Sequence, residues 1–390
     1  MKTESVGKDC ALTDENVRKK FLMIGPKTKA VVNFRGDLLR DIRKSGYDVV
    51  VVSPEDDCHD FFRDNNIKLR LVKLNKNSVS ISGGVAYYKK LKEIIEDEKP
   101  DVVFSFTVKP VIFGSVAAKN AGVERIYSLI CGLGLLFSSN SFYIKVLQKL
   151  VGKMYEYSLK YNKKVFFQNK DDIKEFINRG YINRSRCVLV NGSGVNLKKF
   201  KRNRIPKGEI SFLMVSRVLR EKGVLEYFEA ARTVKKQYPE TRFVYIGAID
   251  KNKNAIKLKS LRPYFESGIV EYVPETNEVE KYVAQSSVFV LPSYYREGVP
   301  RTLLEALAMG RPIITTRTPG CKETVREGVN GVFVEPRNVG DLVEKMEWML
   351  KNRERLQEMG DESYKMCLEK FEVGVINAGM MELMGMKNRL

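Results

Sequence analysis

The chain has 390 residues, of which 43% are hydrophobic and 30% are charged, a balance typical of a soluble globular protein with two domains of ordinary size. Its six cysteines are scattered without a Cys-x-x-Cys pair and His59 is the single histidine, so we expect no zinc-type metal site and reduced thiols, as in a cytosolic protein. The net charge is +20, with 36 Lys and Arg against 22 Asp and Glu in residues 1–200, and this basic half favours an anionic partner: nucleic acid, an anionic membrane surface or a phosphorylated substrate.

Neither a targeting segment nor a membrane span is predicted. Residues 1–20 contain no apolar run of the kind found in a signal peptide. The longest stretch without a charged residue, 126–144, contains several serines and glycines, and it is too polar and too broken to cross a bilayer. A cytoplasmic location is therefore expected.

Strands alternate with helical patterns over residues 21–195, after a polar N-terminal extension, residues 1–20, that we predict to be mobile. The predicted strands are 21–25, 49–53, 67–74, 101–106, 126–130 and 165–168. Helical patterns lie between them, at 38–46, 81–99 and 111–122. The alternation predicts an α/β domain with a parallel, doubly wound sheet.

The pattern changes near residue 195. Residues 196–207 are loop-like, basic and interrupted by Pro206, and we predict a linker there. A second α/β domain is predicted over residues 208–372, and a C-terminal helix over 373–390. The strands predicted in this half are 210–215, 242–246, 269–273, 287–291, 312–315 and 331–334. In two Rossmann-like domains of this kind, ligands bind in a cleft beyond the carboxyl ends of the strands.

The clearest site signal lies in residues 287–316. They predict a strand, a glycine-containing loop and a helix that begins near Pro300 and ends at Gly310. Such a helix N-terminus presents backbone N–H groups and a positive dipole end to an anion. Glu297 precedes this helix and Glu305 lies about one turn inside it. Carboxylates repel phosphate but accept strong hydrogen bonds from sugar hydroxyls, which favours a nucleotide sugar; the alternative is an ordinary αβ unit with a capping and a solvent-facing glutamate.

The spacing of Glu297 and Glu305, within EGVPRTLLEALAMGRPII, resembles the Glu-x7-Glu signature of family 4 retaining glycosyltransferases. The resemblance covers most of the chain and is strongest over residues 210–340. It implies a GT-B fold, in which two Rossmann-like domains face a central cleft and the last helix crosses back to the first domain. It also implies that Glu297 faces the transferred sugar and that Glu305 holds the nucleotide ribose. The residues between them that are expected to contact the donor are Gly298, Val299, Pro300, Arg301 and Thr302.

Two basic residues, Arg217 and Lys222, follow the strand predicted at 210–215. A strand-to-helix loop is where doubly wound sheets bind phosphates, and the two cations are suited to neutralising the diphosphate of a leaving nucleotide. The resemblance supports this catalytic role, although Ser216 replaces a glycine of the family's pattern; the alternative is a pair of solvated side chains. Glu323 matches a glutamate that the family places near the nucleotide sugar, or it caps a helix that begins there.

The first domain contains two segments that resemble acceptor-side loops of transferases that extend polyprenyl-diphosphate-linked sugars. The first is GPKTKAVVNFR, which we interpret as a loop, and the second is CGLGLLF. The acceptor-binding residues implied by these segments are Lys27, Lys29, Asn33, Arg35, Gly132 and Gly134. The alternative for the first segment is a surface loop with solvated lysines. The histidine that many members carry in this domain is absent, because His59 lies in a polar loop.

Residues 142–161 predict a basic amphipathic helix. Its apolar face comprises Tyr143, Val146, Leu147, Leu150, Val151 and Met154, and a ridge beside it comprises Lys145, Lys149 and Lys153. A helix of this type is a candidate for binding an anionic membrane surface, or it packs on its own core.

The resemblance implies a retaining hexosyltransferase that moves a sugar from a UDP-sugar to a sugar on undecaprenyl diphosphate, at the inner face of the membrane. The chain has no Asp-x-Asp, so no metal ion or other cofactor is expected, and no nucleic acid is expected as a partner. One alternative is an epimerase or hydrolase of sugar nucleotides with the same fold. The other is a basic nucleic-acid-binding protein, for which the chain has the charge but no recognisable binding module.

Overall fold

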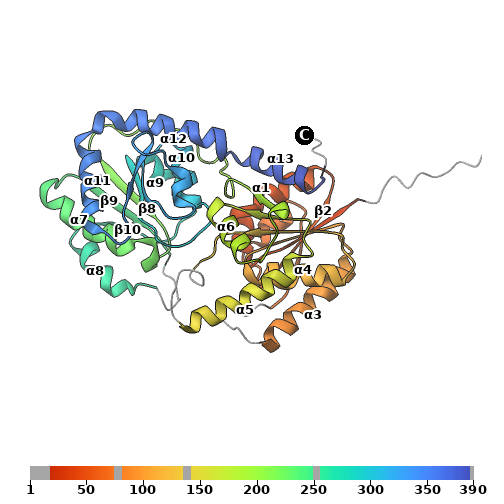
Figure 1. Ribbon diagram of the computed structural model, residues 1–390. Coiled ribbons are helices and arrows are strands. Elements are labelled where there is room, and N and C mark those ends of the chain that lie inside the picture. The colour runs from red at the N-terminus through yellow and green to blue at the C-terminus, as the bar shows by residue number, and fades with distance from the viewer. Residues whose placement is uncertain (1–17, 74–80, 135–141, 249–254, 387–390) are drawn as a thin grey trace, which may run out of the picture.

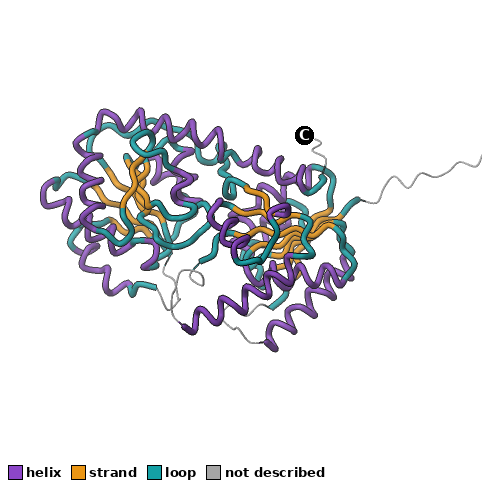
Figure 2. Tube along the Cα trace, in the orientation of Figure 1, coloured by secondary structure: helices purple, strands orange, loops and turns teal. Residues whose placement is uncertain are grey.

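A computed structural model describes residues 18–73, 81–134, 142–248 and 255–386, and these residues form two parallel β-sheets with helices on both faces of each (Figures 1 and 2). The two sheets lie in separate halves of the molecule.

The first domain contains a seven-stranded sheet in the order β3-β2-β1-β4-β5-β6-β7. Its strands are β1 (Lys20–Ile24), β2 (Asp48–Ser53), β3 (Lys68–Leu71), β4 (Val102–Phe106), β5 (Arg125–Ile130), β6 (Lys164–Phe167) and β7 (Cys187–Leu189). Its helices are α1 (Thr28–Lys44), α2 (His59–Asp64), α3 (Ile81–Glu98), α4 (Val108–Asn120), α5 (Phe142–Leu159) and α6 (Lys170–Asn178), with the short η2 (Arg184–Arg186) before β7.

The second domain contains a six-stranded sheet in the order β10-β9-β8-β11-β12-β13. Its strands are β8 (Ser211–Val215), β9 (Arg242–Ile246), β10 (Glu271–Val273), β11 (Val288–Leu291), β12 (Ile313–Thr316) and β13 (Gly331–Val334). Its helices are η3 (Arg220–Lys222), α7 (Val224–Gln237), α8 (Leu258–Glu266), α9 (Val279–Gln285), α10 (Arg301–Ala308), η4 (Cys321–Thr324), α11 (Val339–Lys351), η5 (Arg353–Arg355) and α12 (Leu356–Lys370).

The central strands form because their residues are apolar without interruption. Every residue of β4, β8 and β11 is buried, as expected for parallel strands covered by helices on both faces. The structure confirms every strand that the sequence predicts in the two domains. The longer α11 and α12 were not predicted, and neither were the short α2, α6, α8 and α9 and the three-residue β7. The apolar patterns of the short elements span too few residues to be distinguished from loops.

The chain crosses between the domains at two adjacent points. Val195 and Glu372 form an isolated parallel bridge, in which the N–H of Val195 donates to the carbonyl of Phe371 at 2.9 Å. Beyond this bridge, α13 (Val373–Leu383) packs on α1 of the first domain (Figure 1). The amide of Asn377 donates to the carboxylate of Asp41 at 2.7 Å there. The predicted limits of the domains and of the 196–207 linker stay predictions, and residues 1–17 of the N-terminal extension and 387–390 lie outside the described part.

Candidate active site

The loop between β11 and α10 carries Glu297. Pro300 is the N-cap of α10, as the sequence predicts, and the helix continues from Arg301 to Ala308. Glu297 lies three residues before this cap, and Ser293 follows the end of β11 by two residues. The loop therefore places the Glu297 carboxylate beyond the carboxyl end of β11, beside the N-terminus of α10.

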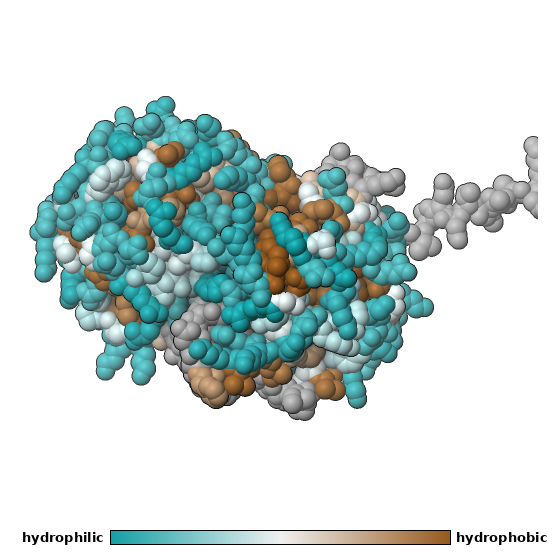
Figure 3. Space-filling view, viewed as in Figure 1, coloured by the Kyte–Doolittle hydropathy of each residue, from teal (hydrophilic) through white to brown (hydrophobic). Residues whose placement is uncertain are grey.

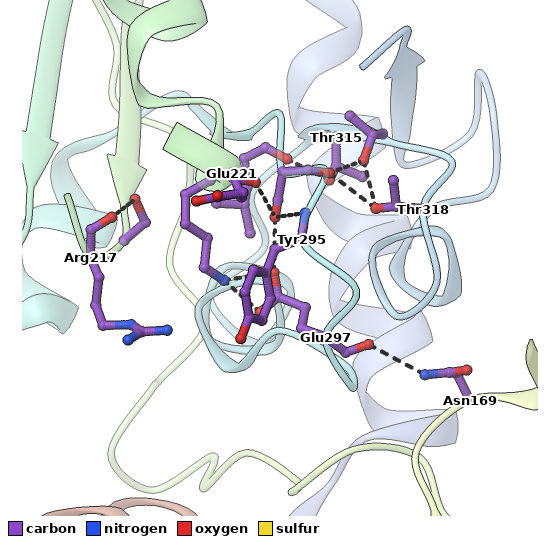
Figure 4. A network of polar contacts seen from close by, with 12 residues as sticks. Asn169, Arg217, Glu221, Tyr295, Glu297, Thr315 and Thr318 are labelled. Atoms are coloured by element: carbon purple, nitrogen blue, oxygen red, sulfur yellow. Dashed lines mark hydrogen bonds and ion pairs between the residues drawn. The ribbon is translucent and has the colours of Figure 1, made fainter. Parts of the chain in front are cut away.

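Lys222 and Glu297 form a close ion pair at this position. The ammonium of Lys222 donates to both carboxylate oxygens of Glu297, each at 2.6 Å, and the hydroxyl of Ser293 donates to one of them at 3.0 Å (Figure 4). The side chains of Lys222 and Glu297 are only 11% and 15% exposed, so water screens the pair weakly. The structure thus joins two residues that the sequence assigned to different parts of a donor, the diphosphate and the sugar.

Arg217 lies in the same strand-to-helix connection as Lys222. It follows β8, and η3 and Gly223 then lead into α7. Gly223 has φ +77°, and a Cβ there would come within 2.3 Å of the carbonyl oxygen of Pro292. The connection is therefore packed directly against the end of β11, which brings Lys222 to Glu297. Figure 4 shows the Arg217 side chain on the opposite side of this group from Asn169.

Glu305 is buried inside the first turns of α10. The side chain of Arg301 donates to it at 2.9 Å, and burial raises the pKa of the Glu305 carboxyl above its usual range while Arg301 opposes the shift. Arg301 also lies over the ring of Phe34 in α1, at 5.9 Å from the ring centroid. The N-terminus of α10 is therefore in contact with the first domain. The remaining predicted donor residues lie at this terminus or in the half-buried η4: Gly298, Val299, Thr302 and Glu323.

The predicted acceptor loop at residues 25–35 is wrong for most of its length. Helix α1 begins at Thr28, so Lys29, Asn33 and Arg35 lie on a helix, and only Lys27 precedes it as the N-cap. Arg35 lies on the same buried face of α1 as Val31, and it is only 2% exposed.

The buried Arg35 lies beside the side chain of Cys131, and burial lowers the pKa of its guanidinium. In contrast, Lys27, Lys29 and Asn33 are exposed. The loop interpretation rested on the resemblance of GPKTKAVVNFR to an acceptor-side loop, but the period of the apolar positions extends through this segment.

Gly132 and Gly134 lie against the second domain. A Cβ on Gly132, which has φ +103°, would lie 2.4 Å from the nitrogen of Gly298, and the N–H of Gly134 donates to the carbonyl of Arg296 at 2.7 Å. The structure therefore brings these two predicted residues to the loop of Glu297. Residues 135–137 of the same motif lie outside the described residues.

Sequence reasoning missed the polar residues of α6 that meet this loop. Asn169, the N-cap of α6, donates from Nδ2 to the carbonyl of Glu297 at 3.3 Å, and Asp171 pairs with Lys322 of η4 at 2.7 Å. Asp172 is buried, and its burial raises the pKa of its carboxyl to about 6. An Asn followed by an acidic residue three positions later is an N-cap signal that would have located the helix, but not its contact with the other domain.

Comparison with known proteins gives two family matches that together span both domains. The profile of "Glycosyl transferase 4-like" matches residues 28–169, and that of "Glycosyl transferases group 1" matches residues 195–366. The chain therefore carries a glycosyl transferase 4-like domain followed by a glycosyl transferases group 1 domain. Within the described residues of this glycosyltransferase, no group of three His, Cys, Asp or Glu side chains is arranged to hold a metal ion.

Two relatives show what this glycosyltransferase is similar to in sequence. It is 27% identical over 337 residues, covering 83% of this chain and 87% of the relative, to the N,N'-diacetylbacillosaminyl-diphospho-undecaprenol alpha-1,3-N-acetylgalactosaminyltransferase of Campylobacter jejuni. It is 24% identical over 312 residues, covering 76% of this chain and 78% of the relative, to the UDP-Gal:alpha-D-GlcNAc-diphosphoundecaprenol alpha-1,3-galactosyltransferase of Escherichia coli.

Solved structures confirm the predicted GT-B architecture. Anabaena HepE in complex with UDP and glucose superimposes with a TM-score of 0.75 at 16% identity, covering 94% of this chain and all of that chain. A glycosyltransferase from Rickettsia africae superimposes with a TM-score of 0.74 at 18% identity, covering 94% and 98%. At these identities the likeness shows the fold alone.

Proposed function

We propose that this glycosyltransferase moves a hexose from a UDP-sugar to a sugar carried on undecaprenyl diphosphate, with retention of configuration and without a metal ion. The names of the Campylobacter and Escherichia relatives, both of which specify diphospho-undecaprenol acceptors, support the acceptor class. The observation that carries the proposal in this chain is the Lys222–Glu297 contact at 2.6 Å, beside the N-terminus of α10.

Different residues of the second domain bind different parts of the UDP-sugar. Lys222, Arg217 and the positive end of α10 neutralise the diphosphate, whose charge grows as the bond from the sugar to UDP breaks. Glu305 accepts from ribose hydroxyls, and Glu297 accepts from a hydroxyl of the transferred sugar. A hydrogen-bonded carboxylate orients a sugar without reacting with it.

The transfer step follows from this arrangement. The C1–O bond to UDP breaks and a new C1–O bond to the acceptor hydroxyl forms on the same face, while the acceptor proton passes to an oxygen of the departing diphosphate. The protein supplies charge and orientation, and no side chain needs to act as the base.

A panel of UDP-sugars with a synthetic polyprenyl-diphosphate sugar tests this function. One donor should yield UDP and a lengthened lipid-linked glycan, with the anomeric configuration of the donor retained. Release of free sugar or of an epimer without any acceptor would instead indicate a hydrolase or an epimerase. Binding to random duplex DNA that weakens with salt, without any transfer, would indicate a nucleic-acid-binding protein.

We also propose that α5 binds the anionic inner face of the membrane, where such an acceptor would be located. The predicted apolar face of this helix is divided: Leu147, Val151 and Met154 pack into the first domain, whereas other apolar residues point outward. Phe142, Val146 and Leu150 recur every four residues and are 83%, 53% and 51% exposed. Hydrophobic side chains gather at this edge of the molecule (Figure 3). The side chain of Tyr143 lies outside the described part.

The exposed stripe lies beside the lysine ridge, of which Lys145 and Lys149 are exposed and Lys153 pairs with Glu156 at 2.8 Å. Among the described residues no helix has the length and apolarity of a transmembrane span. Co-sedimentation with anionic vesicles should weaken with salt and after Lys→Glu changes at the three lysines. Equal binding to neutral and anionic vesicles would contradict the proposal.

A further inference from the structure

Two backbone hydrogen bonds join the residues on either side of Glu297 to the first domain. The N–H of Gly298 donates to the carbonyl of Cys131 at 3.0 Å, and the N–H of Gly134 donates to the carbonyl of Arg296 at 2.7 Å. Cys131 and Gly134 both follow β5 of the first domain. The peptides that flank Glu297 are therefore bound by the domain to which Glu297 does not belong.

Asn169 adds a contact to Glu297 itself. It is fully buried at the N-terminus of α6, where its Oδ1 accepts from the N–H of Asp172 at 2.8 Å. Its Nδ2 donates to the Asp172 carboxylate at 2.9 Å and to the carbonyl of Glu297 at 3.3 Å. A backbone N–H can only donate, so the helix cap fixes which end of the amide is the acceptor and turns the NH2 group toward Glu297.

The loop after β5 packs backbone against backbone on the Glu297 peptide, and the side chain of Gln168 fills the space beside Gly298. A Cβ on Gly132 would lie 2.5 Å from the carbonyl carbon of Glu297, and a Cβ on Gly298 would lie 1.7 Å from Oε1 of Gln168. Such distances leave no space for a side chain between the loop after β5 and the Glu297 peptide. The contact of Asn169 is thus part of a close interdomain fit.

The two halves of Glu297 are therefore held by different domains. Its carboxylate is bound by Lys222 and Ser293 of the second domain, whereas its carbonyl is bound by Asn169 of the first. We propose that Asn169 is a positioning residue, which fixes the Glu297 peptide when the domains close, so that the carboxylate meets the transferred sugar in the closed arrangement. This inference rests on the proposed role of Glu297 in sugar transfer.

The proposal separates turnover from nucleotide binding. Lys222 and Glu305, which are assigned to UDP, belong to the second domain, and the hydrogen bonds of the Asn169 side chain reach neither of them. The Glu297 carboxylate keeps its bonds to Lys222 and Ser293 when the Asn169 amide is lost. Loss of the Asn169 amide should therefore lower kcat and leave UDP affinity unchanged. A residue that only stabilised the fold would instead reduce the amount of folded protein and leave both constants of the folded fraction intact.

Asn169→Ser is the informative variant, because serine keeps a good helix cap but is too short to donate to Glu297. We expect kcat to fall about fivefold or more, which corresponds to the loss of one hydrogen bond, with donor KM and the UDP dissociation constant within about twofold of wild type. Asn338→Ser is the matched control, because Asn338 caps α11 in the same way, accepting from the N–H of Asp341 at 3.0 Å. Its kcat should equal that of wild type.

Hydrogen exchange gives a readout that does not depend on transfer. The amides of residues 294–299 should exchange faster in Asn169→Ser than in wild type, and at the wild-type rate in Asn338→Ser. Unchanged exchange in this segment, or an Asn169→Ser enzyme with wild-type kcat, would overturn the proposal. If the wild-type protein transferred no sugar, the proposed function would fail, and exchange in residues 294–299 would still decide whether Asn169 holds the Glu297 peptide.

Discussion

The Lys222–Glu297 ion pair predicts that Glu297→Gln binds UDP more tightly than wild type while transferring sugar more slowly. In the wild-type protein two N–H groups of the Lys222 ammonium point at the carboxylate, at 2.6 Å each, so a diphosphate must share or displace that carboxylate to reach the same ammonium. Glutamine keeps the shape of the side chain but removes the negative charge that competes for Lys222 and repels the diphosphate.

The magnitude follows from the kind of bond that is contested. A charge-assisted hydrogen bond contributes about 1.5–3 kcal/mol, and most of one such bond must be exchanged when the diphosphate arrives. We therefore expect UDP binding to strengthen by about 1–2 kcal/mol, or about 5- to 30-fold in the dissociation constant. Turnover should fall because the oriented contact with the transferred sugar is lost.

Titration calorimetry with UDP measures this effect on three variants and a control. Lys222→Met should weaken UDP binding, and adding Glu297→Gln to it should produce a much smaller gain than Glu297→Gln produces alone, because the contested ammonium is gone. Asp48→Asn, which breaks a partly exposed ion pair with Arg43 at the start of β2, should leave UDP affinity unchanged. If Glu297→Gln binds UDP as wild type does or more weakly, Glu297 does not compete for Lys222.

Three further predictions address the rest of the site. Glu305→Gln should raise the donor KM about tenfold with kcat nearly unchanged, because ribose contacts do not change during transfer; steady-state kinetics that showed the reverse split would contradict the ribose assignment. A chelator should leave the initial rate of transfer intact, and a rate that returned only with added magnesium or manganese would refute the metal-independent reaction. Burial raises the pKa of Asp172 to about 6, so between pH 4 and pH 6 the folded state keeps a proton that the unfolded state has released. The contribution of Asp172 to the unfolding free energy should therefore fall by about 3 kcal/mol between pH 4 and pH 7. Asp172→Asn should remove that fall, so thermal midpoints of variant and wild type should diverge, with the variant gaining, as the pH rises through 6.

The elements of this fold were predictable where one side-chain pattern continues long enough. Buried strands such as β8 and β11 are uninterrupted apolar runs, and Pro300 and Gly310 mark the limits of α10. The first residues of α1 were instead interpreted as a loop from a family resemblance, and the charged Arg35 interrupts the apolar stripe that would have indicated a helix. The resemblance of residues 25–35 to an acceptor-side loop indicated a function for this segment, but it did not indicate the secondary structure.

The site was predictable as a set of residues but not as an arrangement. Lys222 and Glu297 were both identified from their positions after strands, yet their ion pair joins residues 75 positions apart, and the contact of Asn169 with Glu297 spans 128. Spacing in a sequence fixes which end of a sheet a loop occupies. The Lys222–Glu297 pair depends in addition on β8 and β11 being neighbours in one sheet, and the Asn169 contact depends on how the two domains meet.

Two glycines, Gly132 of the first domain and Gly320 of the second, let the backbone around Glu297 pack against both domains. A Cβ on Gly132 would lie 2.5 Å from the carbonyl carbon of Glu297, and a Cβ on Gly320 would lie 1.5 Å from the carbonyl oxygen of Gly298. At each of these points the nearest atoms are backbone, which cannot rotate away as the end of a long side chain can. The loop that carries Glu297 is thus enclosed between one loop of its own domain and one of the other. Because the contact with Gly132 exists only while the domains meet, a movement that separated them would release one side of this peptide. Under the proposed role of Glu297, this would couple sugar transfer to domain closure.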